Sequence, residues 1–194
     1  VANVFVQSNI NQFGALAMAG CGSYSKIEGF GFIPVTCFSQ ALTTFIGQNL
    51  GAKEYDRAKK GALFGTICGI GIAEVIGIAV FFFSPYLIAA FGGDQRAIEY
   101  GIAEAHTIAL FYCLLAFSHC MAAIQRGAGR SIVPMFVMMI VWCGVRVTYI
   151  SIVIRIIPVI NVIYWAYPLT WFISSVIFLI LFLKTDWIHG LEKQ

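Results

Sequence analysis

The sequence predicts an all-α protein whose helices cross a membrane several times, and three observations lead to this class. Hydrophobic residues make up 60% of the chain and charged residues 11%, whereas a soluble domain carries about 45–50% and about 25%. The apolar residues form runs longer than about 18 residues, which can span a bilayer. Basic residues gather in the loops between these runs. We therefore expect one domain, residues 1–194, built as a polytopic transmembrane helix bundle.

The apolar runs set the boundaries of the expected helices. Residues 1–12 are too short to cross a bilayer of about 30 Å, so we expect them to be the end of a longer helix. The other helices are expected at about 15–49, 58–83, 97–124, 131–154 and 160–183. Periodicity alone would allow a loop at 23–29 in the first of these. Small residues at every fourth position from Gly61 to Gly77 predict a face that a neighbouring helix can approach closely.

The basic residues are distributed unevenly between the two ends of these helices. One end carries Lys53, Arg57, Lys59, Lys60, Arg126, Arg130, Lys184 and Lys193, and the other carries Lys26, Arg96 and Arg155. Because basic loops stay in the cytoplasm, we expect the first end, with the C-terminus, to be cytoplasmic in a multi-pass protein of the cell membrane. The bilayer also explains the basic residues without a nucleic-acid partner.

The residues give no sign of an enzyme or of a metal site. No two of the six cysteines have the Cys-x-x-Cys spacing of a zinc or redox site. The segment Gly127-Ala128-Gly129-Arg130 lacks the lysine and the spacing of a phosphate loop. No nucleophile stands beside a base, so neither a catalytic residue nor a metal is predicted.

Three strings resemble the multidrug and toxic compound extrusion (MATE) family of transporters. They are QALTTFIGQNLGA at residues 40–52, RGAGRS at 126–131 and WCGVR at 142–146. The first surrounds a polar turn and is followed by a basic segment, and the second is a short loop before the penultimate helix. The motif positions in and after these strings are Gln48, Asn49, Gly51, Arg57, Arg126, Gly127, Gly129 and Arg146.

The resemblance implies the C-terminal lobe of a two-lobe transporter, with about six helices of which the first is truncated. It favours one long helix from about 15 to 49 over a loop at 23–29. The partner would be the N-terminal lobe of the same protein, across a central cavity. The implied function is export of organic-cation drugs and other xenobiotics by alternating access, coupled to H⁺ or Na⁺ and without a cofactor.

Ionisable side chains inside apolar helices are costly to insert, so each one needs a reason. Glu74, Glu104 and His119 are the candidates for cation coupling. The competing interpretations are a structural carboxylate paired with Arg146 and a histidine that only packs. Arg146 keeps its proton, so we expect it to anchor helices by hydrogen bonds or to pair with Glu74 or Glu104. Some members of the family use an acid in the other lobe, which would place the main ligand outside this chain.

Four further residues are candidates for lining a substrate cavity, Gln40, Thr43, Tyr112 and Phe117. Organic cations are bound by apolar contact and cation–π attraction, although aromatic residues in membrane helices usually only pack. Two other functions stay open. A flippase for lipid-linked oligosaccharides would need a cationic cavity, which a single intramembrane arginine supports weakly. A non-transporting membrane scaffold would use the glycine face as an oligomer interface.

Overall fold

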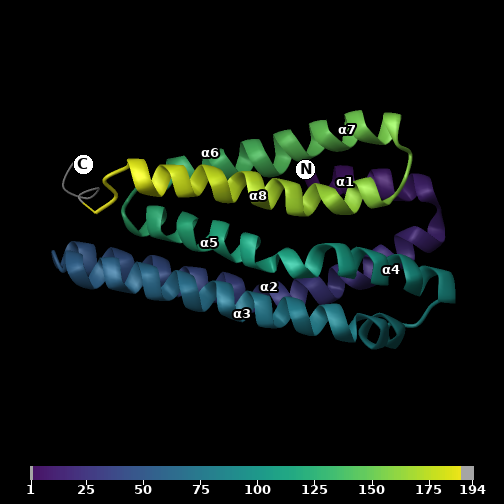
Figure 1. The fold of residues 1–194 in the computed structure, drawn as a ribbon, viewed down its shortest axis with the longest axis horizontal. Helices are drawn as coiled ribbons and strands as arrows, with labels where there is room; N and C mark the ends of the chain where they lie inside the picture. The colour runs from purple at the N-terminus through teal and green to yellow at the C-terminus, as the bar shows by residue number, and fades with distance from the viewer. Residues whose placement is uncertain (1, 189–194) are drawn as a thin grey trace.

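The computed structural model of the chain describes residues 2–188, and within that range nearly every residue is helical and no strand occurs. Lys193 lies outside the described residues. The elements are α1 (Ala2–Ile10), η1 (Asn11–Phe13), α2 (Ala15–Gly51), α3 (Tyr55–Ala90), α4 (Gln95–Ile108), η2 (Ala109–Phe111), α5 (Tyr112–Gly127), α6 (Ile132–Met138), η3 (Met139–Val145), α7 (Arg146–Ile156) and α8 (Asn161–Lys184). Figure 1 shows an elongated bundle whose long helices run along its longest axis.

Five stretches of the described chain are long and apolar enough to cross a membrane. They are α2, α3, α4 with α5 through η2, α6 with α7 through η3, and α8. The α2–α3 turn, the α5–α6 turn and the end of α8 share one end of the bundle (Figure 1). The predicted all-α, multi-span fold class is confirmed, and the stretch from 23 to 29 lies inside one continuous helix.

The helix α3 extends past its expected end at residue 83 and continues to Ala90, although Pro85 lies within it. A proline leaves the carbonyl four residues earlier without its helical donor, which here is the carbonyl of Phe81. The Ser84 hydroxyl donates to that oxygen at 3.2 Å, and His106 Nε2 lies 3.1 Å from it. Because side chains replace the lost backbone bond, the helix tolerates the proline.

Small residues bring the helices into close contact inside the bundle. A Cβ at Gly77 would collide with the carbonyl oxygen of Ala109, and one at Gly20 would collide with that of Ala97. The expected glycine face of α3 therefore packs against α2, η2 and α5 of the same chain. The scaffold hypothesis needs this face to be free for another copy, and it is not.

Large apolar side chains also cover the outward faces of the bundle. Leu63, Phe64 and Ile67 of α3 are more than half exposed, and so are Phe172 and Leu183 of α8. In a membrane these side chains contact lipid tails, which are as apolar as leucine.

Candidate functional site

A polar cavity of about 370 Å³ lies among α1, α2, α4, η3, α7 and α8. Its charged and polar lining includes Gln7 of α1, Ser25 and Glu28 of α2, Glu104 of α4, and Arg146 at the start of α7. Four aromatic residues also line it, Phe32, Trp142, Tyr167 and Trp171. Its volume lies in the range of about 300–1,000 Å³ that holds small ligands. We refer to this space as the polar cavity.

Glu104, predicted from its place in an apolar helix, lines the polar cavity. Its side chain is 3% exposed, and its Oε2 atom has no hydrogen-bond partner among the described residues. A buried polar atom without a partner costs free energy, about 1–3 kcal/mol. Because most buried polar atoms in proteins are hydrogen-bonded, this oxygen needs an explanation, and a bound ion is one.

Glu28 is the second carboxylate of the polar cavity, and sequence reasoning did not select it. It lies on α2, and its Oε1 atom is buried without a hydrogen-bond partner among the described residues. The sequence contains a feature that could have identified Glu28, because an acid inside an apolar helix is costly wherever it occurs. The neighbouring Lys26 made the segment resemble a loop, and this hid the signal.

Arg146 is the only basic residue that lines the polar cavity as described. Its Nη2 donates to Thr170 Oγ1 on α8 at 2.8 Å, and its guanidinium carbon lies 4.3 Å from the centroid of the Tyr167 ring. These contacts join α7 to α8. Within the described residues, neither Glu74 nor Glu104 forms the salt bridge with Arg146 that was expected as an alternative. Its Nε atom is buried without a partner.

The helix that carries Arg146 changes geometry just before this residue. Met139–Val145 form a π-helical segment, η3, in the middle of the span. π-Helical segments are rare and often occur at functional sites. Trp142 lies within it, donates from Nε1 to Ser174 Oγ at 3.3 Å, and faces the polar cavity. The segment thus positions one ring and one charge on the same cavity.

Glu74 has a different environment from the two cavity carboxylates. Its Oε2 accepts a hydrogen bond from the backbone N–H of Cys113 at 3.2 Å. Cys113 stands in the first turn of α5, where backbone N–H groups lack helical partners. Glu74 therefore caps the helix that restarts after η2, and it does not line the polar cavity.

His119 and Tyr112 lie behind the wall of the polar cavity. The His119 ring packs edge-on against Phe32 and Trp142, with centroids 6.4 Å and 5.5 Å away, and its Nε2 atom is buried without a partner among the described residues. The Tyr112 hydroxyl lies 3.1 Å from that of Tyr24, and both residues are buried. Neither candidate faces the cavity directly.

The other three cavity candidates are dispersed. Gln40 is exposed, and the Thr43 hydroxyl donates to the carbonyls of Ser39 at 3.0 Å and Ala123 at 3.3 Å. Phe117 lines a separate apolar groove. The structure does not bring these residues together with Glu104.

The motif positions of the first string form the turn between α2 and α3. The carbonyl of Gln48 accepts from Ala52 N–H at 3.0 Å, and Asn49 accepts from Glu54 N–H at 2.8 Å. Gly51 ends α2, and Arg57 is exposed in the first turn of α3. These residues shape the turn and do not reach the polar cavity.

The second string forms the turn between α5 and α6. Gly127 allows α5 to approach α2, because a Cβ there would lie 2.7 Å from the carbonyl oxygen of Thr43. Gly129 has a φ of +79°, which favours glycine. Arg126 lies in the last turn of α5, where a positive charge complements the helix dipole. This motif is also structural.

Comparisons with known proteins agree with the resemblance found in the sequence. The family model MatE matches residues 1–151. The chain belongs to the MATE family. MATE proteins are membrane transporters, so this family membership confirms a multi-pass membrane protein that is not an enzyme.

Two MATE relatives illustrate how much of the family protein this chain represents. It is 30% identical over 130 residues to "Probable multidrug resistance protein NorM" of Thermotoga maritima, covering 66% of this chain and 28% of the relative. It is 24% identical over 151 residues to "Probable multidrug resistance protein YoeA" of Bacillus subtilis, covering 76% and 32%. The matches thus span a third or less of the length of each relative.

Solved MATE structures show the same helix arrangement. An outward-facing multidrug resistance MATE transporter matches with a TM-score of 0.87 at 19% identity, over 95% of this chain and 41% of that one. An inward-facing structure matches with a TM-score of 0.85 at 18% identity, over 95% and 42%. The chain has the fold of one lobe of a MATE transporter.

Proposed function

We propose that this chain is the C-terminal lobe of an antiporter that exports organic cations in exchange for H⁺ or Na⁺, and that the polar cavity holds the coupling cation. The observation that carries the proposal is the pair of carboxylates, Glu28 and Glu104, on one cavity with atoms that lack partners. No cofactor is needed besides the transported cation.

The charges in the polar cavity favour the binding of one cation. Two ionised carboxylates and the guanidinium of Arg146 leave one negative charge without compensation. A charge inside the membrane is expensive unless it is paired. One H⁺ or Na⁺ bound to Glu28 or Glu104 removes this excess, and so does one organic cation.

Competition for the same carboxylates would couple the two movements. A ligand shifts a conformational equilibrium only through different affinities for its two states. If the coupling cation and the drug cannot bind together, each must leave before the other enters, which is the requirement for exchange. The aromatic rings of Phe32, Trp142 and Trp171 supply cation–π contacts for the drug.

The cavity requires a second lobe to complete it. We propose that the N-terminal lobe of the same protein covers its open side and that the two lobes move against each other in alternating access. The substrates would be organic-cation drugs and other xenobiotics.

Two carboxylates against one guanidinium do not suit the anionic substrate of an oligosaccharide flippase. The glycine face that a scaffold would need is packed within this chain. The export hypothesis therefore explains more of the described residues than either alternative.

The test is transport by the complete protein in proteoliposomes with an imposed H⁺ or Na⁺ gradient. We expect Glu28→Gln and Glu104→Gln each to lower gradient-driven uptake of a fluorescent organic cation at least about fivefold. Glu99→Gln is the matched control, because Glu99 lies on the same helix as Glu104 but is exposed. Full activity in both cavity variants would disprove the proposed coupling site.

The orientation is tested separately. We propose that the end carrying Lys60 and the C-terminus is cytoplasmic. In intact cells, an impermeant thiol reagent should label Arg96→Cys and spare Lys60→Cys, in a background whose native cysteines are replaced. The reverse pattern would invert the topology.

A further inference from the structure

A second cavity, of about 510 Å³, lies between α3, α5 and α8 and shares no lining residue with the polar cavity. We call it the apolar groove. Nearly all of its lining is apolar, including Phe117, Met121, Leu179 and Phe182. None of its lining residues is acidic, so the groove offers no carboxylate to a coupling cation.

The segment that follows α8 forms part of the wall of the groove at the charged end of the bundle. Trp187 is 5% exposed and stacks on Phe182, with ring centroids 5.5 Å apart. The turn between α5 and α6 contacts the residue before Trp187, since Arg130 Nη2 donates a hydrogen bond to the backbone carbonyl of Asp186 at 2.9 Å. Packing and a hydrogen bond therefore fix the position of this part of the groove wall.

The groove runs along the helices and starts at the charged end of the bundle. On α3 its lining extends from Lys59 through Leu63 to Thr66, a rise of about 10 Å at about 1.5 Å per residue. On α8 it includes Leu179 and Leu183, one turn apart. The groove thus runs from the charged end of the bundle into its apolar part. An acyl chain in one leaflet runs in the same direction, from the polar surface into the hydrocarbon core.

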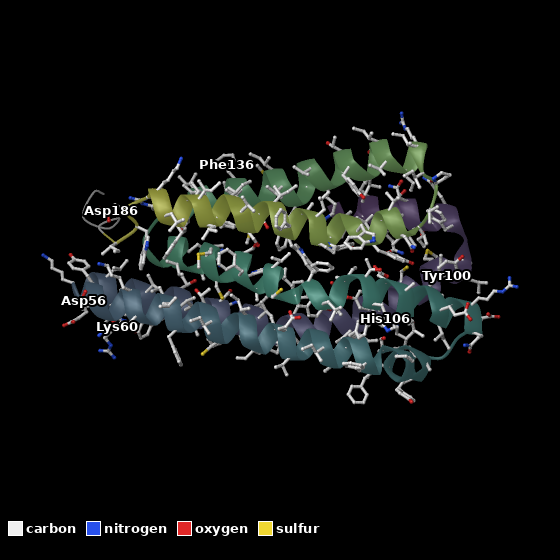
Figure 2. All side chains as sticks on the ribbon, in the orientation of Figure 1. Asp56, Lys60, Tyr100, His106, Phe136 and Asp186 are labelled. Atoms are coloured by element: carbon white, nitrogen blue, oxygen red, sulfur yellow. The ribbon has the colours of Figure 1, made fainter. Side chains whose placement is uncertain are left out.

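Lys59 is the one charged residue that lines the groove as described, and it is exposed at the mouth. Lys60 follows it on α3, and Asp56 is the acidic residue of the same helix end. Figure 2 shows Asp56, Lys60 and Asp186 at this end of the bundle. No described residue forms a salt bridge with Lys59, so its ammonium group is available to an anion.

We propose that the apolar groove binds an acyl chain of an anionic phospholipid whose headgroup phosphate contacts Lys59. Basic residues at the ends of transmembrane helices bind anionic headgroups. The apolar wall next to Lys59 would contact the acyl chain of the same lipid. An organic cation fits less well, since the groove lacks an acid and the one charged residue that lines it is a lysine. The inference is independent of the proposed coupling site.

The experiment measures lipid retention by the complete protein in detergent, with phosphatidylglycerol and phosphatidylcholine of identical chains. Native mass spectrometry and thermal unfolding report binding without any need for transport. We expect phosphatidylglycerol to be retained in preference and to raise the Tm more. Lys59→Gln should lower this preference about fivefold, as expected for one basic residue near a phosphate.

Two further variants separate the headgroup from the chain. Lys60→Gln is the matched control, since Lys60 does not line the groove, and it should keep the preference. Leu179→Trp should fill the groove and reduce retention of both lipids. An unchanged preference in Lys59→Gln would overturn the proposal, and so would unchanged retention in Leu179→Trp. If inorganic phosphate displaced phosphatidylglycerol from the protein as well as added phosphatidylglycerol does, Lys59 would be a site for a free anion, and the lipid proposal would be wrong.

Discussion

The surroundings of Glu74 and Glu104 differ although both acids lie within apolar spans. Glu74 accepts a hydrogen bond from the Cys113 backbone where α5 begins. Glu104 is almost fully buried and leaves one carboxylate oxygen without a partner among the described residues. The cost of inserting an acid marks both positions in the sequence, and only the structure shows that Glu74 has a backbone partner while one oxygen of Glu104 has none.

The largest expected effect comes from comparing the two acids in one transport assay. Glu104→Gln should lower coupled uptake about 5- to 150-fold, the range of a typical coupling interaction. Glu74→Gln should change uptake per folded molecule little, because its amide oxygen still accepts from Cys113. Equal losses in the two variants, measured at equal amounts of folded protein, would remove the distinction.

The next effect tests the close contact beside Glu74. Gly77→Ala places a methyl group against the Ala109 carbonyl, which is backbone and cannot rotate away. We expect a loss of about 1–3 kcal/mol in stability from overpacking, seen as a lower Tm in detergent. Gly71→Ala is the control, because nothing lies within 4 Å of its added Cβ. A Tm equal to that of the control would show that the helices can move apart at no cost.

A similar effect is expected when the cap itself is removed. Glu74→Ala leaves the Cys113 N–H without its acceptor, and we expect a loss of about 1 kcal/mol in stability because this hydrogen bond is partly buried. Glu74→Gln should restore most of the Tm. If glutamine failed to rescue, the charge of Glu74 rather than its acceptor oxygen would be the important property.

The smallest effect concerns Glu104 and the stability of the fold. Removing an unpartnered buried oxygen relieves its desolvation cost, so Glu104→Met should leave the Tm unchanged or raise it while transport falls. A marked fall in Tm would instead identify Glu104 as a structural residue.

The class of fold could be predicted because it depends on composition, which is averaged over the whole chain. The break at η2 and the π segment η3 could not, because neither contains a proline or a glycine pair that would announce it. At Pro85 the sequence predicts the end of a helix, but α3 continues to Ala90. Its effect on the helix is offset by Ser84 and His106, which no local pattern reveals.

The candidate site was predicted in part. Glu104 and Arg146 could be found because charges in apolar runs stand out, and both line the polar cavity. The sequence does not single out Glu28 beside Lys26. It also does not show which way the Phe117 ring points, and in the structure this ring lines the apolar groove. His119 stays a prediction, placed behind the aromatic wall of the cavity.

The helix α8 forms part of the wall of both cavities, since Trp171 faces the polar cavity and Phe182 faces the apolar groove. Between these two residues the helix contains neither proline nor glycine, so no residue of this segment favours a bend. A tilt that widens one space must alter the other. A lipid in the apolar groove would then influence the polar cavity through α8, without contact with Glu28, Glu104 or Arg146.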